Sequence, residues 1–167
     1  MRTPVYELHI RPMFRATDRD HMSFAVDLWD YDAVVAHADE ILTRLEADMP
    51  PLATGGPWPE EWVALFRRWT ESGHKRVELG TAQFTFHQTA TTVTITATGT
   101  FPAAGYQGWL QLETEAETAK TYVLYFEPPD APDDAGAAGN FNLRERYSAT
   151  GSGSVFVRDS TGVQQLH

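Results

Sequence analysis

The chain has 167 residues and a formal net charge of −10 at pH 7, with acidic residues in excess in both halves. Nucleic acid and anionic membrane surfaces bind through clustered Lys and Arg, so neither is expected as a partner. With no cysteine, the chain has no disulfide, iron–sulfur cluster or thioether-linked haem. Its start lacks a basic stretch followed by an apolar one, and we therefore expect a cytoplasmic location.

Three helices are expected in the first part of the chain. The first covers residues 18–28, and the second runs from Asp30, a residue type that caps helix starts, to about residue 48. Proline and glycine interrupt the chain after the second helix, and the third runs from Pro59 to Gly73. Its apolar stripe consists of Trp62, Leu65, Phe66 and Trp69. Trp69 should therefore be structural, whereas Trp29, between two helices, should be partly exposed.

After His74 the apolar period changes from helical to two, which is typical of strands with one buried face. Strands are expected at 77–87, 92–98, 107–114, 120–127, 141–149, 153–159 and 163–166. Short strands at this density favour a β-sandwich of immunoglobulin or fibronectin type. The predicted fold class is α+β: a three-helix module at 1–75 and an antiparallel β-sandwich at 76–167.

Large aromatic side chains stand beside turns in both parts, and such side chains often anchor protein interfaces. The candidate partner-binding residues are Trp29, Tyr31, Tyr106 and Trp109. A Pro/Gly/Ala-rich segment at 128–140 is expected to be a mobile loop, and it carries the carboxylates of Asp130, Asp133 and Asp134. These features suggest an accessory protein that recognises a protein partner through aromatic and acidic loops.

Residues 8–75 resemble a class I cytochrome c domain in the order of their motifs. An apolar segment with a proline, residues 10–14, leads into Thr17 to His21, where Thr17 and Asp20 stand at the family's two cysteine positions and His21 at its histidine position. Residues 36–45 resemble the middle helix of the family. Met49-Pro50 resembles its distal ligand loop, and residues 58–73 resemble its closing helix.

The resemblance implies a cytochrome-like helical fold, but the missing cysteines exclude covalent haem. His21 and Met49 could still ligate a non-covalent haem, as His/Met pairs do in electron carriers. The alternative without a cofactor is a helical scaffold in which large side chains fill the space that haem occupies in the family. The side chains of suitable size are Met13, Phe14, Met22, Phe24, Trp29 and Trp62.

Two further functions stay open at this stage. Sulfur and imidazole ligands suit copper, and the candidate ligands are Met13, His21, Met22 and His37. An enzyme with its site between the two modules is the other alternative, although the sequence contains no convincing nucleophile, base or cofactor motif. The leading hypothesis is a non-catalytic interaction protein without a cofactor. The alternatives are a redox or metal-binding protein and an enzyme.

Overall fold

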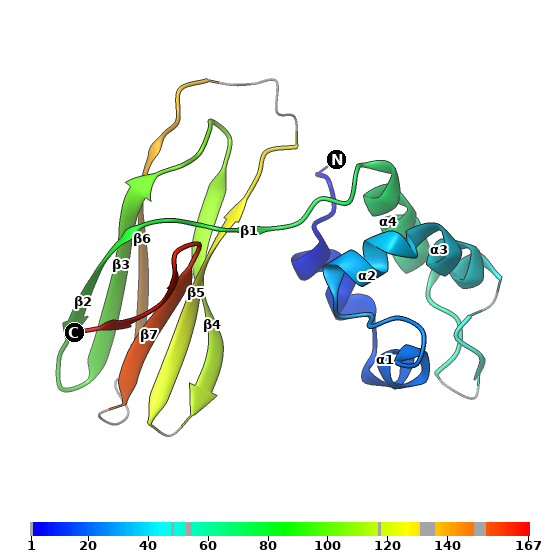
Figure 1. Cartoon of the computed structure of the whole chain (residues 1–167), viewed down its shortest axis with the longest axis horizontal. Helices are drawn as coiled ribbons and strands as arrows, with labels where there is room; N and C mark the ends of the chain where they lie inside the picture. Colours follow the sequence, from blue (N-terminus) through cyan, green and yellow to red (C-terminus); the bar gives the residue numbers. More distant parts are fainter. Residues whose placement is uncertain (1, 48, 53–54, 117, 131–135, 149–152) are drawn as a thin grey trace. The chain divides into compact units, whose positions relative to one another are not determined.

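A computed structural model describes residues 2–47, 49–52, 55–116, 118–130, 136–148 and 153–167. The chain forms two compact units, Met1–Arg76 and Val77–His167, which we call the helical unit and the β unit (Figure 1). The expected boundary between residues 75 and 76 differs by one residue from this boundary between Arg76 and Val77. Within the acidic segment at 128–140, Asp133 and Asp134 lie outside the described residues.

The helical unit begins with a π-helical turn, η1 (Tyr6–Ile10), and a 3-10 turn, η2 (Arg11–Met13). The α-helices that follow in its described part are α1 (Ala16–Met22), α2 (Tyr31–Ala36), α3 (Ala38–Glu46) and α4 (Glu60–Glu71). The Asp30 side chain caps α2 by accepting a hydrogen bond from Ala33 N at 2.7 Å. Beyond α4, Gly73 takes a φ of 85°, which suits glycine at a helix end.

The prediction of three helices is therefore wrong. The helix expected from residue 30 to about 48 is divided at His37, where the backbone leaves helical geometry with φ −116° and ψ 13°. The helix expected over 18–28 is shorter and shifted, because α1 spans Ala16–Met22 and turns follow it. Residues 6–13, for which no helix was expected, form η1 and η2.

Aromatic rings packed against one another form the centre of the helical unit. Trp69 is fully buried, with ring centroids 5.6 Å from Tyr6 and 5.5 Å from Phe66. The polar atoms of the buried rings reach backbone carbonyls. Tyr6 Oη donates to Leu28 O at 3.1 Å, and Trp69 Nε1 donates to Lys75 O at 2.9 Å. The expectation that Trp69 is buried in the α4 stripe is confirmed.

The β unit contains two sheets (Figure 1), and buried residues of both sheets form one hydrophobic core. In the first sheet, β5 pairs with β4, β1 and β7, and β7 pairs with β8; in the second, β3 lies between β2 and β6. The strands are β1 (Glu78–Leu79), β2 (Gln83–Gln88), β3 (Thr92–Thr100), β4 (Gln107–Ala116), β5 (Ala119–Glu127), β6 (Asn140–Ser148), β7 (Ser154–Asp159) and β8 (Gly162–Leu166).

The expected antiparallel β-sandwich is also wrong. Strands β5 and β7 run parallel, with Tyr122 opposite Val157. The chain leaves the first sheet after β5, contributes β6 to the second sheet, and returns as β7 in the direction of β5. In addition, the single strand expected over 77–87 is two strands in different sheets, because Gly80 to Ala82 separate β1 from β2. The alternation of apolar residues fixes which face is buried, but not which strands become neighbours.

Candidate functional site

The helical unit contains a pocket of about 290 Å³ with mostly apolar walls. Its lining comes from η2–α1, from the turns after α1, from α3 and from the Pro-rich segment before α4. Asp18, His21 and Met22 share one face of α1, because residues three and four apart in a helix are neighbours. Met49 and Trp58 line the same pocket. The predicted pair His21 and Met49 is thus brought to one cavity.

His21 has a defined tautomer in this arrangement. Its Nδ1 lies 2.7 Å from the carbonyl oxygen of Thr17, one turn earlier on α1. A carbonyl oxygen only accepts, so Nδ1 carries a proton, and in the neutral ring Nε2 is then the acceptor. The side chain is exposed. His21 therefore offers an acceptor at the edge of the pocket.

Two lining residues that were not among the predicted site residues hold buried polar atoms without a partner. Asp18 is 7% exposed; its Oδ2 accepts a hydrogen bond from Arg15 N at 3.0 Å, whereas its Oδ1 has no hydrogen-bond partner. Trp58 is 5% exposed, and its Nε1 also has no partner. An unpaired buried polar group costs about 1–3 kcal/mol. The shared helix face of Asp18 and His21 was the sequence signal that could have found the first of them.

Of the large side chains expected to fill the space of a haem, only some line this pocket. Phe14, Met22 and Phe24 line the pocket, and Phe24 is 88% exposed. Trp62 packs behind the wall, with its ring centroid 5.7 Å from that of Trp58. Met13 belongs to the core of the unit, and Trp29 is not part of the lining.

The four candidate copper ligands do not line one pocket. Met22 contributes to the pocket described above and to a second one of about 160 Å³, which His37 also lines. His37 Nδ1 lies 2.9 Å from Ala33 O, so this nitrogen is engaged by the end of α2. His21 lines only the first pocket of the two, and Met13 lines neither. Among the described residues, no group of three or more His, Asp or Glu side chains is placed to hold a metal ion.

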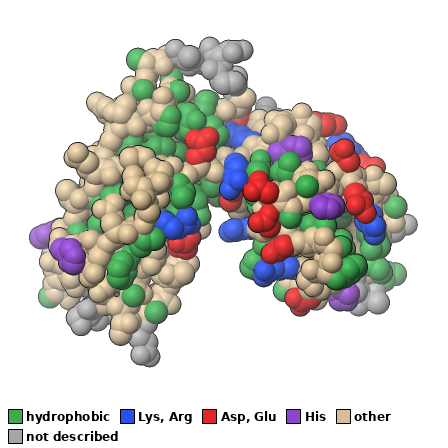
Figure 2. Space-filling model, viewed as in Figure 1, with side chains coloured by type: hydrophobic (Ala, Val, Ile, Leu, Met, Phe, Trp, Pro, Cys, Tyr) green, Lys and Arg blue, Asp and Glu red, His purple; other side chains and the backbone are tan. Residues whose placement is uncertain are grey.

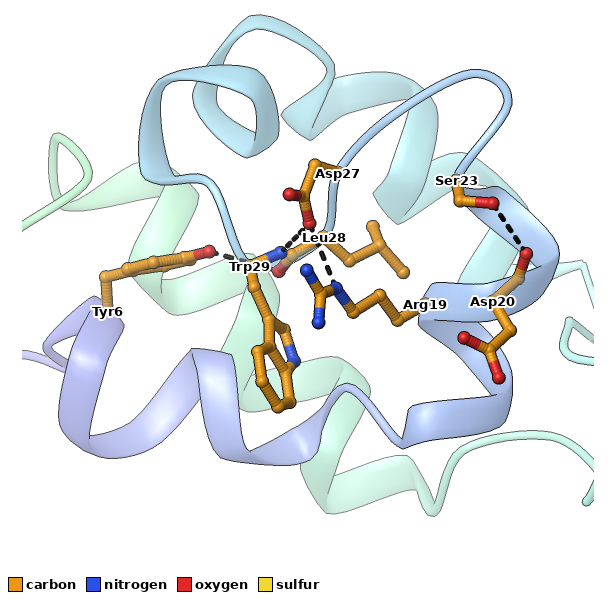
Figure 3. Close-up of polar contacts among 7 residues, drawn as sticks. All are labelled: Tyr6, Arg19, Asp20, Ser23, Asp27, Leu28 and Trp29. Carbon is orange, nitrogen blue, oxygen red and sulfur yellow. Dashed lines mark hydrogen bonds and ion pairs between the residues drawn. The ribbon is translucent and has the colours of Figure 1, made fainter. Parts of the chain in front are cut away.

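Trp29 lies on the surface and is held in place by two charged side chains (Figure 3). The guanidinium carbon of Arg19 is 4.5 Å from the centroid of its ring. Asp27 Oδ1 accepts hydrogen bonds from Trp29 N at 3.0 Å and from Arg19 Nε at 3.3 Å. The bond from the Trp29 amide and that from Arg19 lower the pKa of the Asp27 carboxyl. The name Trp29 platform is used below for Arg19, Asp27 and Trp29.

Trp29 is 48% exposed, which confirms the expected partial exposure. Asp30 and Asp32, close to Trp29 in the chain, are exposed as well, and so is Asp20 on α1. In the space-filling view, charged side chains of both signs cover the helical unit, whereas the visible face of the β unit carries few (Figure 2).

The other candidate partner-binding residues are more enclosed. Tyr31 packs edge-on against Tyr6 and donates its hydroxyl to His74 O at 2.7 Å. Tyr106 is half-buried, and its hydroxyl lies 3.3 Å from Glu78 Oε2. Trp109 is half-buried beside Tyr125, at 6.0 Å between ring centroids. Tyr31 is therefore a packing residue, and Trp29 has the most exposed ring of the four.

Comparison of the chain with protein-family models, curated proteins and solved structures finds no match. The relation to class I cytochromes c therefore stays a prediction from the motifs. In the part of the chain that the structure describes, no helix has the length and apolar character needed to cross a membrane.

Proposed function

We propose that the chain is a non-catalytic interaction protein that recognises a protein partner through the Trp29 platform. The observation that carries this proposal is that Trp29 is 48% exposed although its ring is stacked under Arg19 and its backbone N–H is bonded to Asp27. An ordered ring loses little conformational entropy on binding, and Trp is among the residues that dominate binding energy at protein interfaces.

The chemistry around the platform favours a partner that carries Lys or Arg. The residues Asp30 and Asp32 are exposed and close to Trp29 in the chain, and the whole chain is acidic. Complementary charge accelerates association and selects among partners, and its contribution weakens with salt. We place this interaction in the cytoplasm, since a cysteine-free chain is compatible with a reducing compartment.

The test compares affinity capture from lysate by the wild type, by Trp29→Ala and by Val163→Ala. Val163 is the matched control because it is a 61% exposed apolar residue of β8, in the other unit. A protein retained by the wild type and by Val163→Ala, and lost with Trp29→Ala, is then purified and titrated calorimetrically. We expect about a 30-fold loss of affinity for Trp29→Ala, typical of an interface hot spot, and weaker binding at higher salt.

Two outcomes would contradict the proposal. One is the absence of any protein whose capture depends on Trp29. The other is a partner whose affinity falls equally in the two variants, because such a partner would bind elsewhere on the chain.

A further inference from the structure

The volume of the pocket in the helical unit limits what can occupy it. An apolar cavity of about 150 Å³ holds benzene, and sites for drug-sized ligands have about 300–1,000 Å³. At about 290 Å³, this pocket has room for two fused rings or an aliphatic group of similar size. A four-ring haem macrocycle would enter only after displacement of lining side chains. The pocket therefore fits a compact ligand.

The buried carboxylate of Asp18 defines the polar group that such a ligand should carry. One oxygen, Oδ2, accepts a hydrogen bond from Arg15 N and so caps the start of α1. The other oxygen, Oδ1, has no hydrogen-bond partner, although Asp18 lines a mostly apolar pocket. Arg19, which follows Asp18 in the chain, pairs with Asp27, and Arg15 and Arg44 also donate to other groups. Arg15 Nη1 donates to Gly55 O at 2.8 Å, and Arg44 Nη2 donates to Glu40 Oε1 at 2.7 Å. A cationic donor brought by a ligand would pair the free carboxylate oxygen.

The remaining lining suits the same kind of ligand. The rings of Phe14 and Trp58 lie 5.3 Å apart and supply an aromatic wall, which attracts cations as well as apolar groups. When its ring is neutral, His21 adds a second acceptor, Nε2, at the edge. Met22 and Met49 have flexible side chains that can adapt to the shape of a ligand.

We propose that this pocket binds a compact apolar amine: a group of about two rings that bears an ammonium, with the ammonium paired to Asp18. This site does not use the Trp29 platform, so it stands apart from the proposed partner recognition. Binding is non-covalent, and the ligand needs no metal or cofactor.

Isothermal titration of the full chain with three probes of the same ring system tests the assignment. The probes are naphthylmethylamine, naphthylmethanol and naphthoate, which present a cation, a neutral hydroxyl and an anion. We expect the amine to bind at least about tenfold more tightly than the alcohol, because its hydrogen bond to Asp18 is charge-assisted, and naphthoate to bind most weakly.

Variants separate the carboxylate from the cavity. Asp18→Asn keeps an oxygen that can cap α1 and removes the charge, so the amine should fall to the affinity of the alcohol. Asp39→Asn, exposed on α3 and outside the pocket lining, removes the same charge and should leave all three affinities unchanged. Leu45→Phe reduces the free volume and should weaken all three probes. It also tests the cavity if Asp18→Asn does not fold.

Several outcomes would overturn the proposal: no binding of any probe, equal affinity for amine and alcohol, tighter binding of naphthoate, or an unchanged amine preference in Asp18→Asn. Stoichiometric binding of hemin, with a Soret band that is lost in His21→Ala, would assign the pocket to haem instead. None of these results depends on Trp29, so the amine proposal and the partner proposal can be contradicted independently of each other.

Discussion

The helical unit and the β unit bury their largest side chains in different ways. In the helical unit, the single side chain of Trp69 contacts four other rings, those of Tyr6, Tyr31, Phe66 and His74. In the β unit, buried residues are spread over both sheets, and backbone ladders as long as the nine residue pairs between β3 and β6 add to their packing. Stability is thus concentrated in few side chains in the first unit and distributed in the second.

The largest effect that follows from this difference is expected for Trp69→Ala. Removal of a fully buried Trp costs about 3–5 kcal/mol, enough to unfold a small unit. We expect two-dimensional NMR spectra to lose the dispersed signals of the helical unit while those of the strands remain. Trp62→Ala, at a half-buried position of the same helix, is the control and should cost less. Loss of both sets of signals together would show that stability is not divided between the units.

A smaller effect is expected in the β unit from Gly80→Ala. A Cβ atom at Gly80 would lie 2.6–2.8 Å from the buried ring of Phe126, which would have to move. Overpacking of this kind costs about 1–3 kcal/mol. Denaturant titration of the β unit signals measures the cost. Gly139→Ala, where no atom lies within 4 Å of the added methyl group, should change stability little. Equal costs at the two positions would show that the core near Phe126 yields easily.

Trp29→Ala should affect stability less than either change above. The ring is half exposed, and its contact with Arg19 is an exposed cation–π pair worth about 0.5–1 kcal/mol. We expect the thermal midpoint to move by a few degrees at most. A loss as large as that of Trp69→Ala would mean that the platform belongs to the core, and it would remove the basis for partner recognition there.

The smallest expected effect is a pH-dependent release of the Trp29 platform. Because the pKa of Asp27 is lowered in the folded chain, its interactions with Trp29 N and Arg19 are fully present above the ordinary carboxyl pKa of about 4. They weaken as the pH falls through the lowered value. The difference in fluorescence between the wild type and Trp29→Phe should therefore change in this acid range. Asp27→Asn should abolish the change, and persistence of the change in that variant would assign it to another group.

The sequence predicted those parts of the fold whose pattern is long and regular. The stripe of α4 identified Trp69 as buried, and the alternation around Ile95 located β3. Tyr6 was missed, although it is central to the helical core, because a single π-helical turn has too few residues to show a period. The break at His37 was also missed, since the residues on both sides continue the apolar spacing of one helix.

The candidate site divides in the same way. Trp29 was identified from its place between two helices, and its exposure follows from local chain geometry. The pocket could be anticipated only through the family resemblance, which pointed to His21 and Met49. Asp18 and Trp58 come from segments 40 residues apart, and their unpaired atoms depend on how tertiary packing brings these segments together. The helix face that Asp18 shares with His21 is visible in the sequence, but no local pattern shows that Trp58 joins them or that these atoms stay unpaired.

The parallel pairing of β5 with β7 joins segments that are distant in the chain, and such contacts lower the rate of folding. The β7–β8 hairpin is local in sequence, whereas the pairing of β7 with β5 joins strands between which the chain adds β6 to the other sheet. Closing the loop between distant segments costs conformational entropy before the strand contacts stabilise the pair, and this slows folding. During synthesis, the helical unit emerges first and contains its own core. The short strand β1 at the start of the β unit must then wait for β5 before it gains its partner.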